Sequence, residues 1–238
     1  MYISRITFAA ALTLIGTNGA HAAVIVADSF DYVSGPLNGK NGGVGAWTAG
    51  WVGFGLNASF SMAVTNNDPP PKSAQRELVI QAGTSVVFVS FEFAPPTGAT
   101  VNDSSLLRMM SGATVVASIG KPAGASAWSI GRVSFVSTGI PASDEARIVA
   151  AYDFNGDGAR PVWVNPDAED FFNMTTGASS ADAVRVGNVP TQASSVSLDA
   201  SIEGVSYDTL IIASDPSDVG LLASGSGAAR AISTATAR

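Results

Sequence analysis

Short stretches in which apolar and polar residues alternate recur along this chain from residue 24 to about residue 214. In Val86–Phe93, one face carries only valine and phenylalanine, whereas the other carries Phe88, Ser90 and Glu92. A period of two is typical of β-strands. Strands are predicted at Val24–Asp28, Ser59–Val64, Glu77–Gln81, Val86–Phe93, Ser105–Met110, Thr114–Ile119, Trp128–Val136, Arg147–Phe154, Pro161–Val164, Ala183–Val186, Ser195–Ile202 and Tyr207–Ala213.

Glycine, proline and asparagine separate these stretches, and no convincing amphipathic helix interrupts them. Asp167–Met174 is expected to form one helical turn at most. The pattern predicts an all-β fold, a two-sheet antiparallel β-sandwich of the jelly-roll type, in one domain over residues 23–214. Residues 215–238 are small, polar and short of core-forming side chains, which predicts a disordered tail.

The first 22 residues have the three parts of a secretory signal peptide. Arg5 provides the positive charge, Ile6–Ile15 form an apolar stretch, and Ala20–Ala22 form a small-x-small cleavage site. The apolar stretch is shorter than the roughly 20 residues of a membrane span. We therefore expect a mature chain of 216 residues outside the cytoplasm, either secreted, at the cell surface or in the periplasm, with no transmembrane segment.

Composition excludes several kinds of chemistry. The chain has no cysteine, and its one histidine, His21, lies in the leader. The mature protein therefore has neither thiol nor imidazole for nucleophilic catalysis, zinc sites or disulfides. Loss of Arg5 takes the formal net charge from −7 to −8, and an acidic surface repels phosphate backbones, so no nucleic-acid partner is expected.

Three local patterns carry a family resemblance. They are Ala23–Trp51, with Asp-x-Phe-x-Tyr, a glycine-rich loop and two tryptophans; Ile130–Val133 followed by Val162–Pro166; and the aromatic-Asp strand in Gly204–Ile212. In this order they resemble bacterial exported domains of the concanavalin A-like (LamG-like jelly-roll) superfamily. The superfamily contains both lectins and glycoside hydrolases. Many such proteins end in a Val-Pro-Glu-Pro sorting signal with a membrane span, which this chain lacks, so sorted anchoring is not expected.

The first and last strands of a closed sandwich protect each other's edges. Val24–Phe30 and Tyr207–Ala213 are therefore predicted to be neighbours.

Four tryptophans are candidates for stacking on sugar rings, whose apolar faces match an aromatic face. Trp128 and Trp163 alternate with aliphatic residues and are expected in the core. Trp47 and Trp51 lie in a glycine-rich loop, where core packing and contact with a glycan are equally compatible with the sequence. They are the predicted ligand-binding residues.

The segment from Asp153 to Gly158 matches the first half of a calcium loop, with Asp153, Asn155 and Asp157 as alternating oxygen ligands. The same residues contain Asn-Gly and Asp-Gly, the preferred dipeptides of a hairpin turn between two strands. A hairpin turn and a bound calcium ion are both retained as hypotheses.

Hydrolysis of a glycoside needs two carboxylates on either side of one bond. The five glutamates are dispersed, and Glu92 is the best single candidate for a catalytic residue. The function expected from the sequence is a non-catalytic exported module that binds glycan or has a structural, adhesive role at the cell surface. A glycoside hydrolase of the same superfamily is the alternative.

Overall fold

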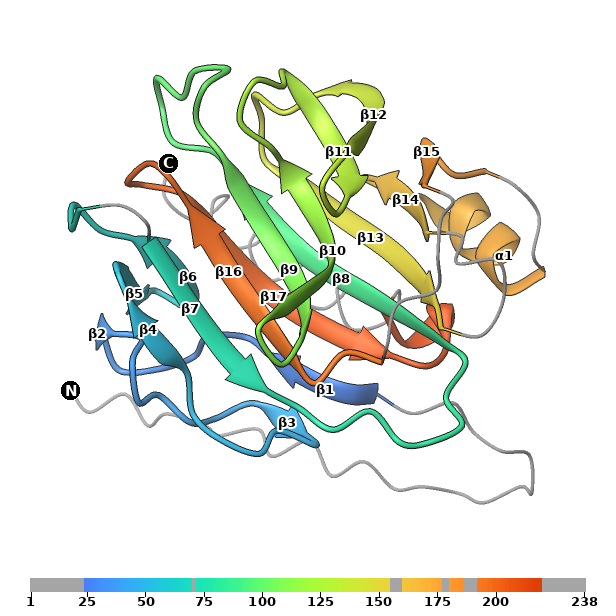
Figure 1. Cartoon of the computed structure of the whole chain (residues 1–238), viewed down its shortest axis with the longest axis horizontal. Coiled ribbons are helices and arrows are strands. Elements are labelled where there is room, and N and C mark those ends of the chain that lie inside the picture. The colour runs from blue at the N-terminus through green and yellow to red at the C-terminus, as the bar shows by residue number, and fades with distance from the viewer. Residues whose placement is uncertain (1–23, 70–71, 155–159, 177–179, 186–191, 220–238) are drawn as a thin grey trace, which may run out of the picture.

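The chain forms two antiparallel sheets in the computed structural model, which describes residues 24–69, 72–154, 160–176, 180–185 and 192–219. The seven-stranded sheet has the order β12 (Phe135–Pro141), β11 (Ala127–Gly131), β10 (Thr114–Lys121), β9 (Ser105–Ser111), β16 (Ser195–Ala200), β7 (Lys72–Glu77) and β4 (Val52–Phe54). The ten-stranded sheet has the order β15 (Ala183–Arg185), β14 (Arg160–Val164), β13 (Ala146–Asp153), β8 (Val86–Ala94), β17 (Ser206–Ala213), β6 (Met62–Thr65), β5 (Leu56–Ser59) and β2 (Gly35–Pro36), with β1 (Val24–Asp28) beside β17 and β3 (Val44–Gly45) beside β1. Figure 1 views the sandwich onto the seven-stranded sheet, and the predicted two-sheet β-sandwich is confirmed.

The first and last strands are neighbours, as predicted. β1 pairs antiparallel with β17, with Val26 opposite Ile212 and Asp28 opposite Leu210. β13 pairs antiparallel with β14, which confirms the predicted hairpin partners on either side of residues 155–159. Trp128 and Trp163 are buried, as expected.

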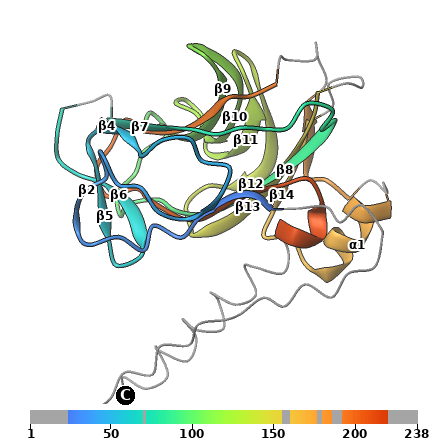
Figure 2. The ribbon, with the colours of Figure 1, turned by 90° about the horizontal axis from the view of Figure 1, so that it is seen from below.

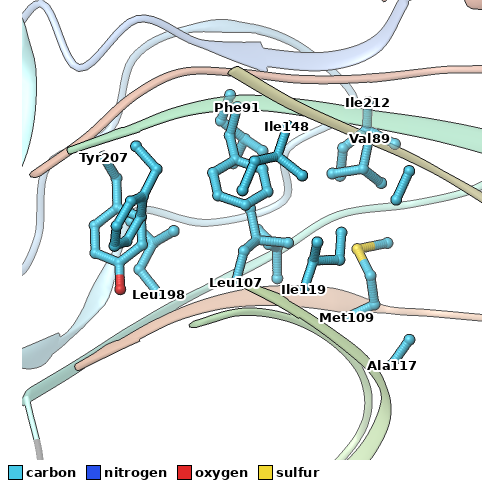
Figure 3. Packing of buried hydrophobic residues seen from close by; sticks show 14 of the residues in the cluster. Val89, Phe91, Leu107, Met109, Ala117, Ile119, Ile148, Leu198, Tyr207 and Ile212 are labelled. Carbon is cyan, nitrogen blue, oxygen red and sulfur yellow. The ribbon is translucent and has the colours of Figure 1, made fainter. Parts of the chain in front are cut away.

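The main core lies between the two sheets (Figure 3). Val89 and Phe91 of β8 face Leu107 and Met109 of β9 across the sandwich. Tyr207 of β17 reaches across it, because its hydroxyl donates a hydrogen bond to a backbone oxygen of the seven-stranded sheet, that of Asp199, at 2.7 Å. Burial raises the pKa of Tyr207, so the phenol stays protonated and keeps this bond between the sheets.

The expectation of one helical turn at most near residue 170 was wrong. α1 (Ala168–Thr176) has nine residues. Asp167 caps it: its Oδ1 accepts hydrogen bonds from the backbone N–H groups of Glu169 (2.8 Å) and Asp170 (3.0 Å), while the Asp170 carboxylate accepts one from the Asp167 N–H (3.1 Å). This reciprocal capping satisfies N–H groups that a helix start leaves free.

A second apolar cluster lies on the outer face of the ten-stranded sheet, where α1 covers β13 and β14 (Figure 2). It includes Phe88, Trp163 and Met174. Val219, from a helical turn at 216–219, is fully buried in the same cluster, and its carbonyl accepts a hydrogen bond from Arg147. The folded domain therefore extends at least five residues beyond the predicted boundary at residue 214. The predicted signal peptide and residues 220–238 of the predicted tail lie outside the described residues.

The turn between β5 and β6 contains a strained aromatic residue. Phe60 and Ser61 have φ values of 49° and 64°, although hairpin turns of this kind favour asparagine and glycine at both positions. Phe60 is 88% exposed and so gains little from burial. We expect Phe60→Asn to raise the free energy of unfolding by about 1 kcal/mol, measured by urea denaturation. Val133→Asn, at another exposed position, is the control and should change little; a loss of stability in Phe60→Asn would contradict the prediction.

Candidate functional site

Polar side chains cover the outer face of the seven-stranded sheet along β7 and β16. On β7, Lys72, Ala74 and Arg76 point into the sandwich, so the alternate residues face outward. The register places Glu77 opposite Ser195 and Gln75 opposite Ser197. The outward residues of the two strands are Ser73, Gln75, Glu77, Ser195, Ser197 and Asp199.

Hydrogen bonds hold these side chains in place. Gln75 Nε2 donates to Ser195 Oγ at 2.8 Å, and the Ser73 and Ser197 hydroxyls are 3.2 Å apart. Ser197 Oγ donates to Asp199 Oδ2 at 2.7 Å. Ser195 and Ser197 are themselves buried and hold the more accessible Ser73, Gln75 and Asp199 in place. The sheet thus presents a pre-oriented polar surface, which loses little side-chain freedom when a polar ligand binds.

Two adjoining hollows open at one end of this surface. The hollow on the β4 side has a volume of about 340 Å³ and is lined by Ala49, Gly50, Val52, Gln75 and Glu77. The hollow on the β16 side has a volume of about 570 Å³ and is lined by Thr48, Gln75, Glu77, Leu78, Val79, Gly112, Ala113, Ser194 and Ser195. Gln75 and Glu77 form the wall that they share. These two hollows and the polar surface form the candidate functional site.

A third hollow, of about 500 Å³, lies beside Lys121 at the other end of β10. The Lys121 ammonium donates hydrogen bonds to the backbone oxygens of Thr100 (2.8 Å), Val101 (3.3 Å) and Asp103. Burial lowers the pKa of Lys121. Because an ammonium has three donors, Lys121 is fully used within the fold, and this hollow is the weaker candidate.

A buried ion pair positions the loop that borders the site. Arg76 Nη1 and Asp28 Oδ2 are 2.6 Å apart, and both side chains are 1% exposed. Arg76 also donates to the backbone oxygens of Gly42 (2.8 Å) and Ala49 (2.9 Å). The guanidinium therefore ties β7 to the glycine-rich loop, in which Thr48 lines the β16-side hollow and Ala49 and Gly50 line the β4-side hollow.

The Asp-x-Phe-x-Tyr motif supplies the rest of this network. Asp28 Oδ2 accepts hydrogen bonds from the Tyr32 hydroxyl (2.5 Å) and from Trp51 Nε1 (2.9 Å). The Asp28 carboxylate also accepts a hydrogen bond from the Phe30 backbone N–H at 2.8 Å. Burial, and then the bond to Asp28, raise the pKa of Tyr32, which keeps it a donor. Sequence reasoning found these residues as a motif but missed Arg76, their central partner.

The structure corrects the expectation for Trp51, which is fully buried and unavailable to a glycan. Trp47 is half-buried: Arg76 lies 4.3 Å from the centre of its ring, and its Nε1 donates to the Ala27 carbonyl at 3.2 Å. The loop between the two tryptophans borders the site through Thr48, Ala49 and Gly50. Contact between Trp47 and a glycan stays a prediction.

The predicted calcium site falls partly outside the described residues. Asp153 ends β13 and is half-buried, whereas Asn155 and Asp157 belong to residues 155–159. Among the described residues, no group of three or more acidic or histidine side chains is close enough to hold a metal ion. Calcium at Asp153, Asn155 and Asp157 therefore stays a prediction. Titration calorimetry should show calcium binding to the wild type and none to Asp157→Ala; a wild type that does not bind millimolar calcium would leave only the hairpin turn.

Glu92, the residue named for hydrolysis, lies on the other sheet, away from the candidate site. In the register of β8 it stands opposite Arg147 on β13 and Asp208 on β17. Partial burial lowers the pKa of the Arg147 guanidinium, and the nearby negative charge of Glu92 acts in the opposite direction. Glu92 is thus placed beside a cation in the outer layer of the ten-stranded sheet.

Comparisons with known proteins found no relative by sequence and distant similarities by structure. No model of a known protein family matches the chain, and no curated protein matches it significantly in sequence. Among solved structures, it is similar to the CBM2 module of the evolved Dit protein of Lactobacillus casei BL23 phage J-1, with a TM-score of 0.48 and 7% identity over 82% of this chain and 96% of that one. It is also similar to the carbohydrate recognition domain of Emp47p, with a TM-score of 0.41 and 10% identity over 83% and 98% of the two chains. The chain has a two-sheet antiparallel β-sandwich fold. Among the described residues, no helix is long and apolar enough to cross a membrane.

Proposed function

We propose that the protein is an exported, non-catalytic β-sandwich module that binds glycan on the outer face of the seven-stranded sheet. The observation that carries the proposal is the pre-oriented polar surface of β7 and β16 with its two adjoining hollows. Membership of the LamG-like branch of the concanavalin A-like superfamily belongs to the same proposal. It is supported by the order of the sequence motifs along the chain.

The chemistry of the surface suits an uncharged sugar. A sugar ring offers hydroxyl groups around its rim and an apolar face of C–H groups, so it needs both planar polar partners and an apolar platform. Gln75 and Glu77 supply an amide and a carboxylate. On the adjoining edge strand β4, Val52 and Phe54 are 66% and 56% exposed and supply the apolar area.

The spacing of carboxylates on this face favours binding over hydrolysis. Glu77 lies opposite Ser195, and Asp199 lies four residues further along the same strand pair. Four strand residues span roughly 13 Å, whereas glycosidase carboxylates are about 5–9.5 Å apart. Asp199 is also paired with Arg108 at 3.6 Å.

A glycan array on the mature protein tests the proposal. We expect binding to a subset of neutral glycans, and Gln75→Ala should weaken it about two- to tenfold, since loss of a hydrogen-bonding amide costs about 0.5–1.5 kcal/mol. Gln81→Ala, in the loop after β7, is the matched control and should bind as the wild type does. A silent array would favour the structural, adhesive role, and release of reducing sugar from a polysaccharide would establish the hydrolase alternative.

A further inference from the structure

The wall between the two hollows determines what length of ligand the site can hold; this inference rests on the proposed function. The hollows share Gln75 and Glu77 and lie on either side of the outer face of β7. Val52 of β4 pairs with Gln75 on one side, and Ser195 of β16 pairs with Glu77 on the other. With volumes of about 340 and 570 Å³, each falls in the range of a ligand pocket by itself. A chain of sugars that crosses β7 therefore enters both.

The two hollows differ in their linings. The β4-side hollow is bordered by Ala49, Gly50 and Val52, which offer backbone and apolar surface to one face of a ring. The β16-side hollow also contains the hydroxyl groups of two exposed residues, Thr48 and Ser194. One unit of the ligand would thus be held mainly by apolar contact and the next mainly by hydrogen bonds.

The wall also determines which charge the site accepts. Glu77 is exposed, and its Oε2 accepts a hydrogen bond from Thr48 Oγ1 at 3.3 Å. A uronate or sulfate group in either hollow would lie beside this carboxylate and be repelled. The cation on the same face, Arg108, is already paired with Asp199 at 3.6 Å.

We propose that the site binds a linear, uncharged oligosaccharide of at least two units, with one ring in each hollow and the linkage over Gln75 and Glu77. Affinity then depends on the length of the sugar chain. Acidic oligosaccharides are excluded by Glu77.

Calorimetry with graded oligosaccharides tests chain length. The probes are oligomers of glucose, mannose and N-acetylglucosamine, each from one to six units long. For the series that binds, we expect affinity to rise at least tenfold between one and two units and then level off.

Two matched variants localise this gain. Ala113→Trp, at the exposed β9–β10 turn, fills the β16-side hollow and should abolish the gain with length while leaving the affinity of the single sugar unchanged. Ala123→Trp, in an exposed loop beyond the opposite end of β10, should leave the whole series unchanged. Unfolding curves of both variants verify that each is folded.

Charge selection has its own test. Oligogalacturonides of the same lengths should bind the wild type at least tenfold more weakly than the neutral series, and Glu77→Gln should reduce this difference. Three results would overturn the inference. They are an affinity that does not change with the length of the oligosaccharide, a gain in affinity with length that survives Ala113→Trp, and array hits confined to acidic glycans. A positive array on which none of the graded oligomers binds would overturn it too, whereas a silent array would overturn the proposed function itself.

Discussion

Replacement of Arg76 by methionine is expected to lower the free energy of unfolding by about 3–5 kcal/mol, because it leaves the Asp28 carboxylate buried without its cation. Both side chains are 1% exposed, so water does not replace the lost partner. The carbonyls of Gly42 and Ala49 lose their donor as well. Equilibrium urea denaturation of wild type and Arg76→Met measures the loss.

A second ion pair on the same sheet provides the control. Arg108 and Asp199 are 3.6 Å apart with side chains 35% and 16% exposed, so Arg108→Met should cost at most about 1 kcal/mol. The double variant Asp28→Asn/Arg76→Met should lose less than the two single variants together, since it no longer buries an unpaired charge. If Arg76→Met cost no more than Arg108→Met, the ion pair would not hold the loop in solution.

The sequence predicted those strands whose inward residues are apolar. β8 is rich in valine and phenylalanine and β17 in leucine and isoleucine, and the predicted bounds of both strands lie within one residue of the observed ones. The neighbouring position of β1 and β17 followed from the need to cover sheet edges. In these strands most of the buried residues are apolar, so the hydropathy pattern alone was sufficient to predict the strands.

β7 shows where the same reasoning fails. Its inward residues include Lys72 and Arg76, which are buried but count as polar in any hydropathy pattern. The strand was therefore predicted at Glu77–Gln81, whereas it covers Lys72–Glu77. Arg76 can be buried only because Asp28, Asn41 and backbone oxygens from distant parts of the chain surround it, and a single sequence does not display such partners.

The candidate site was missed for a related reason. Its lining comes from the loop at residues 48–50, from β7, from the β9–β10 turn and from the start of β16. Apart from the glycine-rich loop, these segments carry no motif, and only the sheet register brings them together. The glycine-rich loop borders the candidate site through its backbone and Thr48, whereas the Trp51 indole is buried.

Trp51→Ala is the second variant with a large expected effect. Trp51 is fully buried between Phe30, with ring centres 5.7 Å apart, and Trp47, at 6.2 Å. Truncation leaves a cavity and removes the N–H donor to the buried Asp28 carboxylate. Loss of a buried tryptophan typically costs about 3–5 kcal/mol, so we expect a fall of that size in the free energy of unfolding, measured by urea denaturation.

Trp47→Ala separates packing from ligand contact at the same loop. Trp47 is half-buried and contributes its stacking on Arg76 and one hydrogen bond, so its loss should cost only about 1–2 kcal/mol. This variant should stay folded, so its glycan binding can be compared directly with that of the wild type on the array. Binding that survives Trp47→Ala but weakens in Gln75→Ala would place the sugar over β7, whereas binding lost in Trp47→Ala alone would place it on the indole. A Trp51→Ala protein as stable as the wild type would contradict the buried position of Trp51, and with it the role of the Asp28 network in holding the loop.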